Sequence, residues 1–227
     1  MIKNCVLFGD SFSAEHWKSN ITTYCGKIVA EKLKLNEINF ARGGRGNDRI
    51  VAVCKTFFER YPENKKNSFV ILQWTTPLRH DFPTEDSFKP FDNLDTSWRS
   101  WYTQKEKDLK WVMSQDGWDL DQYHSIRMIL QILDLQGYFE NNSIPYVMYH
   151  GMGAEIQLLN DDIKALYGAI NNKRFFKLNK SHFQYVLDKN LATDPVKNPH
   201  PNKEGHTQWA NDLLAFIENN NLLDINK

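Results

Sequence analysis

A serine closely follows a short apolar run near the start of the chain, in the stretch VLFGDSFS (6–13). Ser11 lies two residues beyond Gly9, where a buried strand would end and a tight turn would begin. Most serines in such a position only complete a turn or cap a helix. A serine held out of a turn beside a general base acts instead as a nucleophile. The question is whether the rest of the chain supplies that base.

Three other polar stretches follow predicted strands or open a helix. They are RGGRGND (42–48), QWT (73–75) and NPHPNKEGH (198–206), and the last contains His200. Each has an ordinary interpretation as a turn, a strand end or a helix cap. In an open parallel sheet, however, the loops after the carboxyl ends of the strands line one crevice. The sequence therefore predicts that Ser11, the glycine-rich loop and His200 meet at one edge of a sheet.

The elements that must position these residues follow from the hydrophobic pattern. Short apolar runs predict buried strands, and apolar residues three and four apart predict amphipathic helices. Asn47 or Asp48 is expected to cap the second helix. Residues 174–186 fit no single element, and FFKL (175–178) is the candidate for a fifth, edge strand. The alternation predicts an α/β fold: a three-layer α/β/α sandwich with a central parallel sheet of about five strands. The predicted strands are 2–8, 37–41, 69–74 and 144–149; the predicted helices are 22–34, 47–61, 121–141, with Ile126, Ile129, Leu130, Leu133 and Tyr138 inward, and 201–219.

The chain of 227 residues is predicted to form a single domain, 1–227, with a tryptophan-rich insertion at about 79–118. This insertion is expected to place irregular structure and short helices over one end of the sheet. Prolines, many charges and four tryptophans interrupt the strand–helix rhythm there.

Composition excludes several classes of function. Lysine plus arginine equals aspartate plus glutamate at 28 each, which provides no basic face for nucleic acid or anionic lipid. The three cysteines form no CxxC and are expected to be reduced core thiols. The seven histidines show no paired metal-ligand spacing, so neither a metal nor another cofactor is predicted. No signal peptide or spanning segment is recognised, so the expected location is the cytoplasm by default, that of a viral host included.

Taken together, four motifs resemble the GDSL or SGNH hydrolase family, and most closely its branch in bacteriophages and marine bacteria. They are FGDSFS (8–13), GRGNDRI (44–50), QWTTPLR (73–79) and HPNKEGH (200–206), and the long segment 123–149 also resembles that branch. The resemblance covers most of the chain in the right order, with the insertion least matched. It implies a flavodoxin-like SGNH hydrolase fold and a serine esterase.

The resemblance also implies roles for individual residues. Ser11 would attack the acyl carbonyl, with His200 as general base and then general acid. Backbone N–H groups of Ser11 and Gly44 would bind the oxyanion. Most members add an asparagine from the third block, where this chain has Thr75. Asn47, at the start of a predicted helix, is expected to take over that role with Thr75 beside it.

A second departure concerns the partner of the histidine. Most members place an aspartate three residues before it, where this chain has Lys197, and the phage-like branch places it two before, where this chain has Asn198. Asp194 lies six residues before His200. Three alternatives stay open: a dyad helped by Asn198, a triad that uses Asp194, or a weakened enzyme.

The expected substrate is a small-molecule or polysaccharide ester, most simply an O-acetyl group on a carbohydrate, because the insertion is aromatic and polar. Candidate substrate contacts are Trp74, Arg79 and Asp10. The tryptophans of the insertion, with His80 and Asp81 nearby, either form an aromatic platform for a sugar ring or make up the insertion's own small core. The main alternative is a carbohydrate-binding or structural protein that keeps the fold without turnover. A dinucleotide-binding module is less favoured, because GGRGNDR lacks the third glycine of that fingerprint. The sequence leaves the oligomeric state open.

Overall fold

The computed structural model describes residues 1–15, 22–83, 98–102, 120–153, 156 and 160–223. Four parallel strands form the central sheet in the order β2-β1-β3-β6. They are β1 (Asn4–Phe8), β2 (Asn36–Asn39), β3 (Ser68–Trp74) and β6 (Tyr146–His150). The strand order reverses between β1 and β3, and ligands bind at the carboxyl side of such a switch point.

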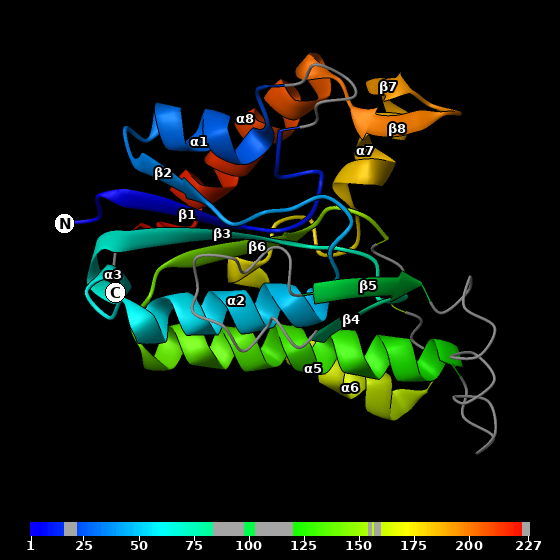
Figure 1. The fold of residues 1–227 in the computed structure, drawn as a ribbon, viewed down its shortest axis with the longest axis horizontal. Coiled ribbons are helices and arrows are strands. Elements are labelled where there is room, and N and C mark those ends of the chain that lie inside the picture. Colours follow the sequence, from blue (N-terminus) through cyan, green and yellow to red (C-terminus); the bar gives the residue numbers. More distant parts are fainter. Residues whose placement is uncertain (16–21, 84–97, 103–119, 154–155, 157–159, 224–227) are drawn as a thin grey trace.

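Helices cover both faces of this sheet (Figure 1). One face carries α2 (Asn47–Arg60) and α5 (Leu120–Asn141), and the other carries α1 (Cys25–Lys32) and α8 (Lys203–Asn219). The remaining helices are α3 (Asn64–Asn67), α6 (Asp161–Gly168), the 3-10 turn η4 (Asn172–Arg174) and α7 (His182–Asp188). The three-layer α/β/α architecture expected from the sequence is confirmed.

Successive residues of each strand feed two separate cores. In β1, Val6 and Phe8 belong to the core beneath α2 and α5, whereas Cys5 and Leu7 belong to the core beneath α1 and α8. Side chains alternate across a strand, so a strand buried on both faces is apolar throughout. β3 shows the same division, and all seven of its residues are buried. The three cysteines are buried and free.

Two small antiparallel strand pairs lie at the carboxyl end of the sheet (Figure 1). One joins β4 (Arg79–Pro83) to β5 (Trp98–Tyr102), and the other joins β7 (Ala192–Asp194) to β8 (Asn198–Pro201). The first replaces part of the irregular structure expected for the insertion. The other parts of that expectation, 84–97 and 103–118, lie outside the described residues.

Three further expectations about the elements are wrong in detail. FFKL contributes one isolated bridge, Met148 to Phe175, so within the described residues the central sheet has four strands rather than about five. Helix α2 is capped by Gly46, not by Asn47 or Asp48, and Gly46 has no side chain to offer. Leu130 is 49% exposed, because Met128, Ile129 and Ile132 fill the inward stripe of α5 instead.

Candidate active site

The turn after β1 brings Ser11 to the histidine that the sequence singled out. Ser11 Oγ lies 2.8 Å from His200 Nε2, although the two residues are 189 positions apart. His200 comes from β8, just before α8, and its ring packs against Phe12 with the ring centroids 5.0 Å apart. A hydroxyl at hydrogen-bond distance from an imidazole nitrogen is the pairing that nucleophile activation requires.

The carboxylate of Asp10, next to Ser11, anchors this turn to the interior of the protein. It is fully buried and accepts hydrogen bonds from Thr75 Oγ1 at 2.6 Å, Gln73 Nε2 at 2.7 Å and Phe12 N at 2.9 Å. Arg79 Nη1 lies 3.6 Å from its second oxygen. Asp10 therefore faces inward and anchors the turn to the end of β3, which contradicts its assignment as a substrate contact.

Gln73 binds Asp10 through its side-chain amide, and apart from its place in QWT no sequence pattern indicates this role. Its amide donates to Asp10 Oδ1 and accepts from Asp10 N at 3.3 Å. A Cβ at Gly9 would lie 2.8 Å from Gln73 Oε1, and a Cβ at Gly151 would overlap the same amide. Both glycines are therefore needed for the close approach of β1, β3 and β6 around one buried amide.

The loop between β2 and α2 lies against the serine from the other side. Arg42 N donates to Gly9 O at 3.1 Å, and a Cβ at Gly43 would lie 3.6 Å from Ser11 Cβ. Gly44 follows with a φ of +78°, in the left-handed region that favours glycine. Among the described residues, the backbone N–H groups of Ser11 and Gly44 donate to no acceptor. Two backbone donors are thus available at and beside Ser11.

The side chains of Asn47 and Thr75 were expected to donate to the oxyanion hole. They make hydrogen bonds to other groups of the protein instead. Asn47 Oδ1 accepts from Thr75 N at 2.9 Å, and Asn47 Nδ2 donates to Thr75 O at 3.2 Å. The single hydroxyl proton of Thr75 goes to Asp10. Both residues are fully buried, and together they join the start of α2 to the end of β3.

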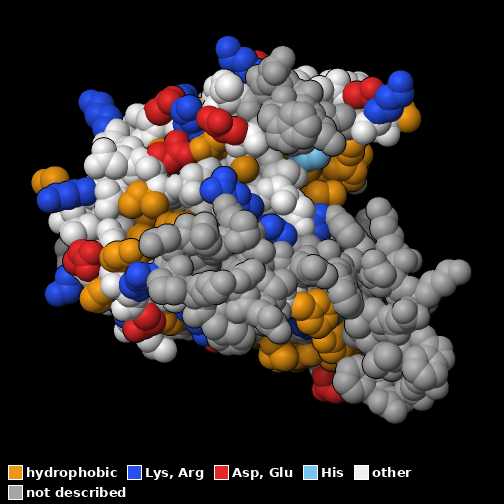
Figure 2. Space-filling view, viewed as in Figure 1, with side chains coloured by type: hydrophobic (Ala, Val, Ile, Leu, Met, Phe, Trp, Pro, Cys, Tyr) orange, Lys and Arg blue, Asp and Glu red, His pale blue; other side chains and the backbone are white. Residues whose placement is uncertain are grey.

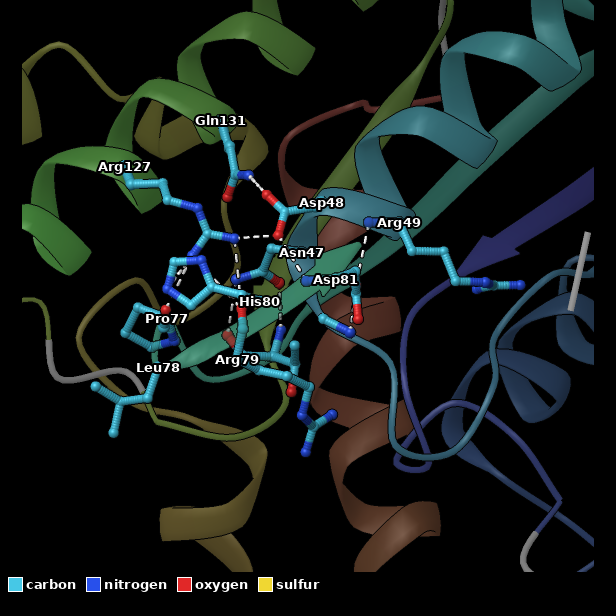
Figure 3. A network of polar contacts seen from close by, with 12 residues as sticks. Asn47, Asp48, Arg49, Pro77, Leu78, Arg79, His80, Asp81, Arg127 and Gln131 are labelled. Atoms are coloured by element: carbon cyan, nitrogen blue, oxygen red, sulfur yellow. Dashed lines mark hydrogen bonds and ion pairs between the residues drawn. The ribbon is translucent and has the colours of Figure 1, made fainter. Parts of the chain in front are cut away.

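A polar network holds the start of α2, although Gly46 offers no cap of its own (Figure 3). Asp81 Oδ2 accepts from Gly46 N at 2.7 Å and from Arg49 N at 3.1 Å, so a carboxylate from β4 caps the helix. Asp48 in turn accepts from Asp81 N at 2.9 Å and pairs with Arg127 of α5. The chain just before and within β4 thus fixes the loop that carries Gly44. Because the cap is supplied from 35 residues away, no local sequence pattern could have indicated it.

We expect Asp81→Ala to lower the free energy of unfolding by about 1–2 kcal/mol, since it removes a helix cap whose acceptor is buried. Chemical denaturation measures this change. Asp161→Ala is the matched control, because Asp161 also lies in a helix first turn but its side chain is 97% exposed. Equal small losses in both variants would contradict the capping role.

The residues proposed to orient His200 differ in how they are placed. Asp194 Oδ1 accepts from Val196 N and Lys197 N, both at 2.9 Å, and so closes the turn between β7 and β8. Asn198 is in β8, where its backbone pairs with Asp194. The side chain of Asn198 lies outside what the structure describes.

Trp74, named as a substrate contact, is fully buried in the core beneath α2 and α5, so that expectation is wrong.

Three buried histidines lie behind or beside the site. His182 stacks on Trp209 with centroids 4.5 Å apart and meets His206 edge-on at 5.4 Å. His150, which ends β6, packs on Phe175. Burial lowers the pKa of His150 and of His206 to about 3, and the charge of His200 lowers that of His206 further. Burial also holds the pKa of His182 well below its ordinary value.

The lowered pKa values of these histidines predict that the folded protein loses stability in acid. Unfolded histidines bind protons below about pH 6.5, whereas His150 and His206 stay neutral in the folded protein until about pH 3. The unfolded state therefore takes up more protons between those values, and the free energy of unfolding falls as the pH falls. Each histidine contributes about 2–3 kcal/mol of this loss at pH 4.5.

His150→Leu is the variant that checks this pH dependence, because neither ring nitrogen of His150 has a hydrogen-bond partner in the described structure. The free energy of unfolding, measured by urea denaturation, should fall less between pH 7 and pH 4.5 in the variant than in the natural protein. Parallel losses in the two proteins would contradict the assignment.

Two general features of the described residues bear on function. No group of three or more His, Cys, Asp or Glu side chains is placed to hold a metal ion there. Across the same residues, the helices are too short or too polar for one of them to span a membrane.

The fold and site define an α/β protein of hydrolase-like architecture with a serine–histidine pair at the switch point of its sheet. No family model and no curated protein matches the chain. Among solved structures it resembles LAE5, an alpha/beta hydrolase enzyme from the metagenome of Lake Arreo, with a TM-score of 0.52, 13% identity, and 98% and 96% of the two chains covered. At this identity the likeness shows a common fold.

Other similar structures are esterases or lipolytic proteins by name. Axe2, an acetylxylan esterase from Geobacillus stearothermophilus, is 15% identical with a TM-score of 0.47, over 95% of this chain and 94% of that one. A putative lipolytic protein of the G-D-S-L family from Desulfitobacterium hafniense is 11% identical with a TM-score of 0.49, over 94% and 99%.

Proposed function

We propose that the protein is a serine esterase of the SGNH type, a single domain that removes an O-acetyl group from a carbohydrate. The observation that carries the proposal is the 2.8 Å contact between Ser11 Oγ and His200 Nε2 at the carboxyl edge of the sheet. We also place the chain in the branch known from bacteriophages and marine bacteria, on the motifs GRGNDRI and QWTTPLR.

The proposed reaction has two steps. In the first, His200 Nε2 takes the proton of Ser11 as its Oγ bonds to the acyl carbon, and the tetrahedral oxyanion accepts from the N–H groups of Ser11 and Gly44. The C–O bond to the sugar then breaks, and His200 returns its proton to the departing alcohol. In the second, His200 activates a water molecule, which releases acetate and restores Ser11. Each oxyanion donor of this kind contributes about 3–4 kcal/mol to the barrier reduction.

We assign the support of His200 to Asn198 rather than Asp194, because Asp194 Oδ1 already accepts two backbone hydrogen bonds. An asparagine can hold the imidazole in one tautomer, as in cysteine–histidine–asparagine sites. We also assign Asn47 and Thr75 to positioning, since their groups bind each other or Asp10. The oxyanion hole that we propose is therefore made by the backbone of Ser11 and Gly44.

The test is intact-mass spectrometry after exposure to a fluorophosphonate. A single adduct on the natural protein that is absent from Ser11→Ala supports the proposal. Ser13→Ala is the matched control, because Ser13 lies two residues away and its hydroxyl binds Tyr149 at 2.9 Å, so its loss should leave the adduct in place. An unlabelled natural protein, under conditions that label a known esterase, would overturn the proposal in favour of a carbohydrate-binding protein on the same fold.

A further inference from the structure

Phe12 contacts the proposed base and is bonded to the proposed nucleophile. It follows Ser11 in the chain, and its backbone N–H donates to Asp10 Oδ1 at 2.9 Å. Its side chain is buried and lies against the ring of His200, with the centroids 5.0 Å apart and the ring planes tilted by 31°. One residue therefore connects Ser11 to the imidazole that must accept its proton.

Two aromatic residues at the start of α7 pack edge-on against Phe12. Its ring centroid lies 5.7 Å from that of His182 and 6.4 Å from that of Phe183. His182 in turn stacks on Trp209 of α8, and Phe183 N donates to Gly151 O, just after β6, at 2.9 Å. Phe12 therefore rests on α7, which is itself held by α8 and by the end of the central sheet.

The imidazole of His200 needs such a support, because it is only half-buried. Figure 2 shows histidine surface beside apolar side chains near α7. The proposed partner, Asn198, can select the tautomer of His200, but a hydrogen bond to one ring nitrogen leaves the ring free to tilt about that bond. A flat aromatic contact restricts the tilt. The restriction matters because a displacement of about 1 Å at a reacting group can lower the rate about 10²-fold.

We propose that Phe12 is a positioning residue, which holds the imidazole of His200 in the orientation that proton transfer from Ser11 requires. The inference rests on the proposed function and adds to it a residue outside the serine–histidine pair. Because the Phe12 ring is buried, its effect reaches the reaction through His200 rather than through contact with substrate. Loss of the ring should therefore lower kcat and leave KM as it is.

The experiment measures p-nitrophenyl acetate hydrolysis and the rate at which a fluorophosphonate labels Ser11. Leucine lacks the flat face of phenylalanine, so Phe12→Leu should lower kcat and the labelling rate about tenfold, and Phe12→Ala about 10²-fold, with KM changed by less than about twofold. Phe139→Leu and Phe139→Ala are the matched controls and should leave both rates as they are. Phe139 is also fully buried, but it packs on Phe58 and Tyr146 in the core beneath α2 and α5.

A double substitution separates positioning of the base from a general disturbance of the turn. If Phe12 acts through His200, Phe12→Leu should cause no further loss of kcat/KM in the His200→Ala background. An equal loss in both backgrounds would overturn the inference, and so would a natural kcat in both Phe12 variants. In either case a labelled Ser11 leaves the esterase proposal standing.

Failure of the proposed function is recognised separately, by a natural protein that the fluorophosphonate does not label. The inference is then tested on the ring itself, by ¹³C relaxation of the His200 Cδ2–H bond. A lower order parameter in Phe12→Leu than in the natural protein and in Phe139→Leu would support the positioning role. An order parameter that Phe12→Leu leaves unchanged would overturn it.

Discussion

His200→Ala is expected to lower kcat for short acyl esters by about 10⁴–10⁶-fold, the cost of removing the base from a serine–histidine pair. The reason is the contact of 2.8 Å between His200 Nε2 and Ser11 Oγ, which provides the route for the hydroxyl proton. Steady-state hydrolysis of p-nitrophenyl acetate measures the loss.

A structural role for His200 is separated from a chemical one by adding imidazole. Because the ring is half-buried and packs on Phe12, its removal leaves a site where free imidazole can stand in for it. Imidazole should restore part of the activity of His200→Ala and none of the activity of Ser11→Ala. Full activity in His200→Ala without imidazole would refute the assignment of the base.

The second large effect is expected from Asp10→Asn, which should lower the free energy of unfolding by about 3–5 kcal/mol. The carboxylate accepts three hydrogen bonds and faces the Arg79 guanidinium. The NH2 group of an asparagine here would face one of the donors that the carboxylate now accepts from, and the substitution removes one of the two carboxylates that favour the charged form of the buried Arg79. Urea denaturation measures the stability. Activity should fall as well, because the adjacent Ser11 loses its anchor.

Asp134→Asn is the control for this experiment. Asp134 pairs with Lys55 at 2.7 Å, but half of its side chain is exposed, so its removal should cost no more than about 1 kcal/mol. If Asp10→Asn destabilised the protein as little as this control, the buried network would not be what holds the turn that carries Ser11.

The chemistry of the site depends on how firmly two loops are held together. Asp10 joins the turn that carries Ser11 to the end of β3 through Gln73 and Thr75. Asp81, in β4, holds the loop between β2 and α2 that carries Gly44. Preorganised donors act on a transition state only when such supports keep them in place. The two networks therefore explain why polar residues are buried beside Ser11 and Gly44.

The sequence by itself determined the layers of the fold and the meeting of distant motifs. Runs such as FVILQW are apolar throughout because parallel strands are covered on both faces. The carboxyl ends of parallel strands share one edge, so turns 189 residues apart could be expected to converge, and the structure places Ser11 and His200 in contact. These inferences succeed because the hydrophobic pattern that predicts each strand or helix lies within a short stretch of the sequence.

Only the tertiary structure decided which polar residues face inward. Asp10 and Trp74 were expected at the substrate surface, yet both are fully buried. Asp81 caps α2 from another element, and one bridge at Phe175 takes the place of a fifth strand. Each outcome depends on which partner a distant segment brings to a given atom. Composition and spacing specify which groups need partners, but only packing selects the partner.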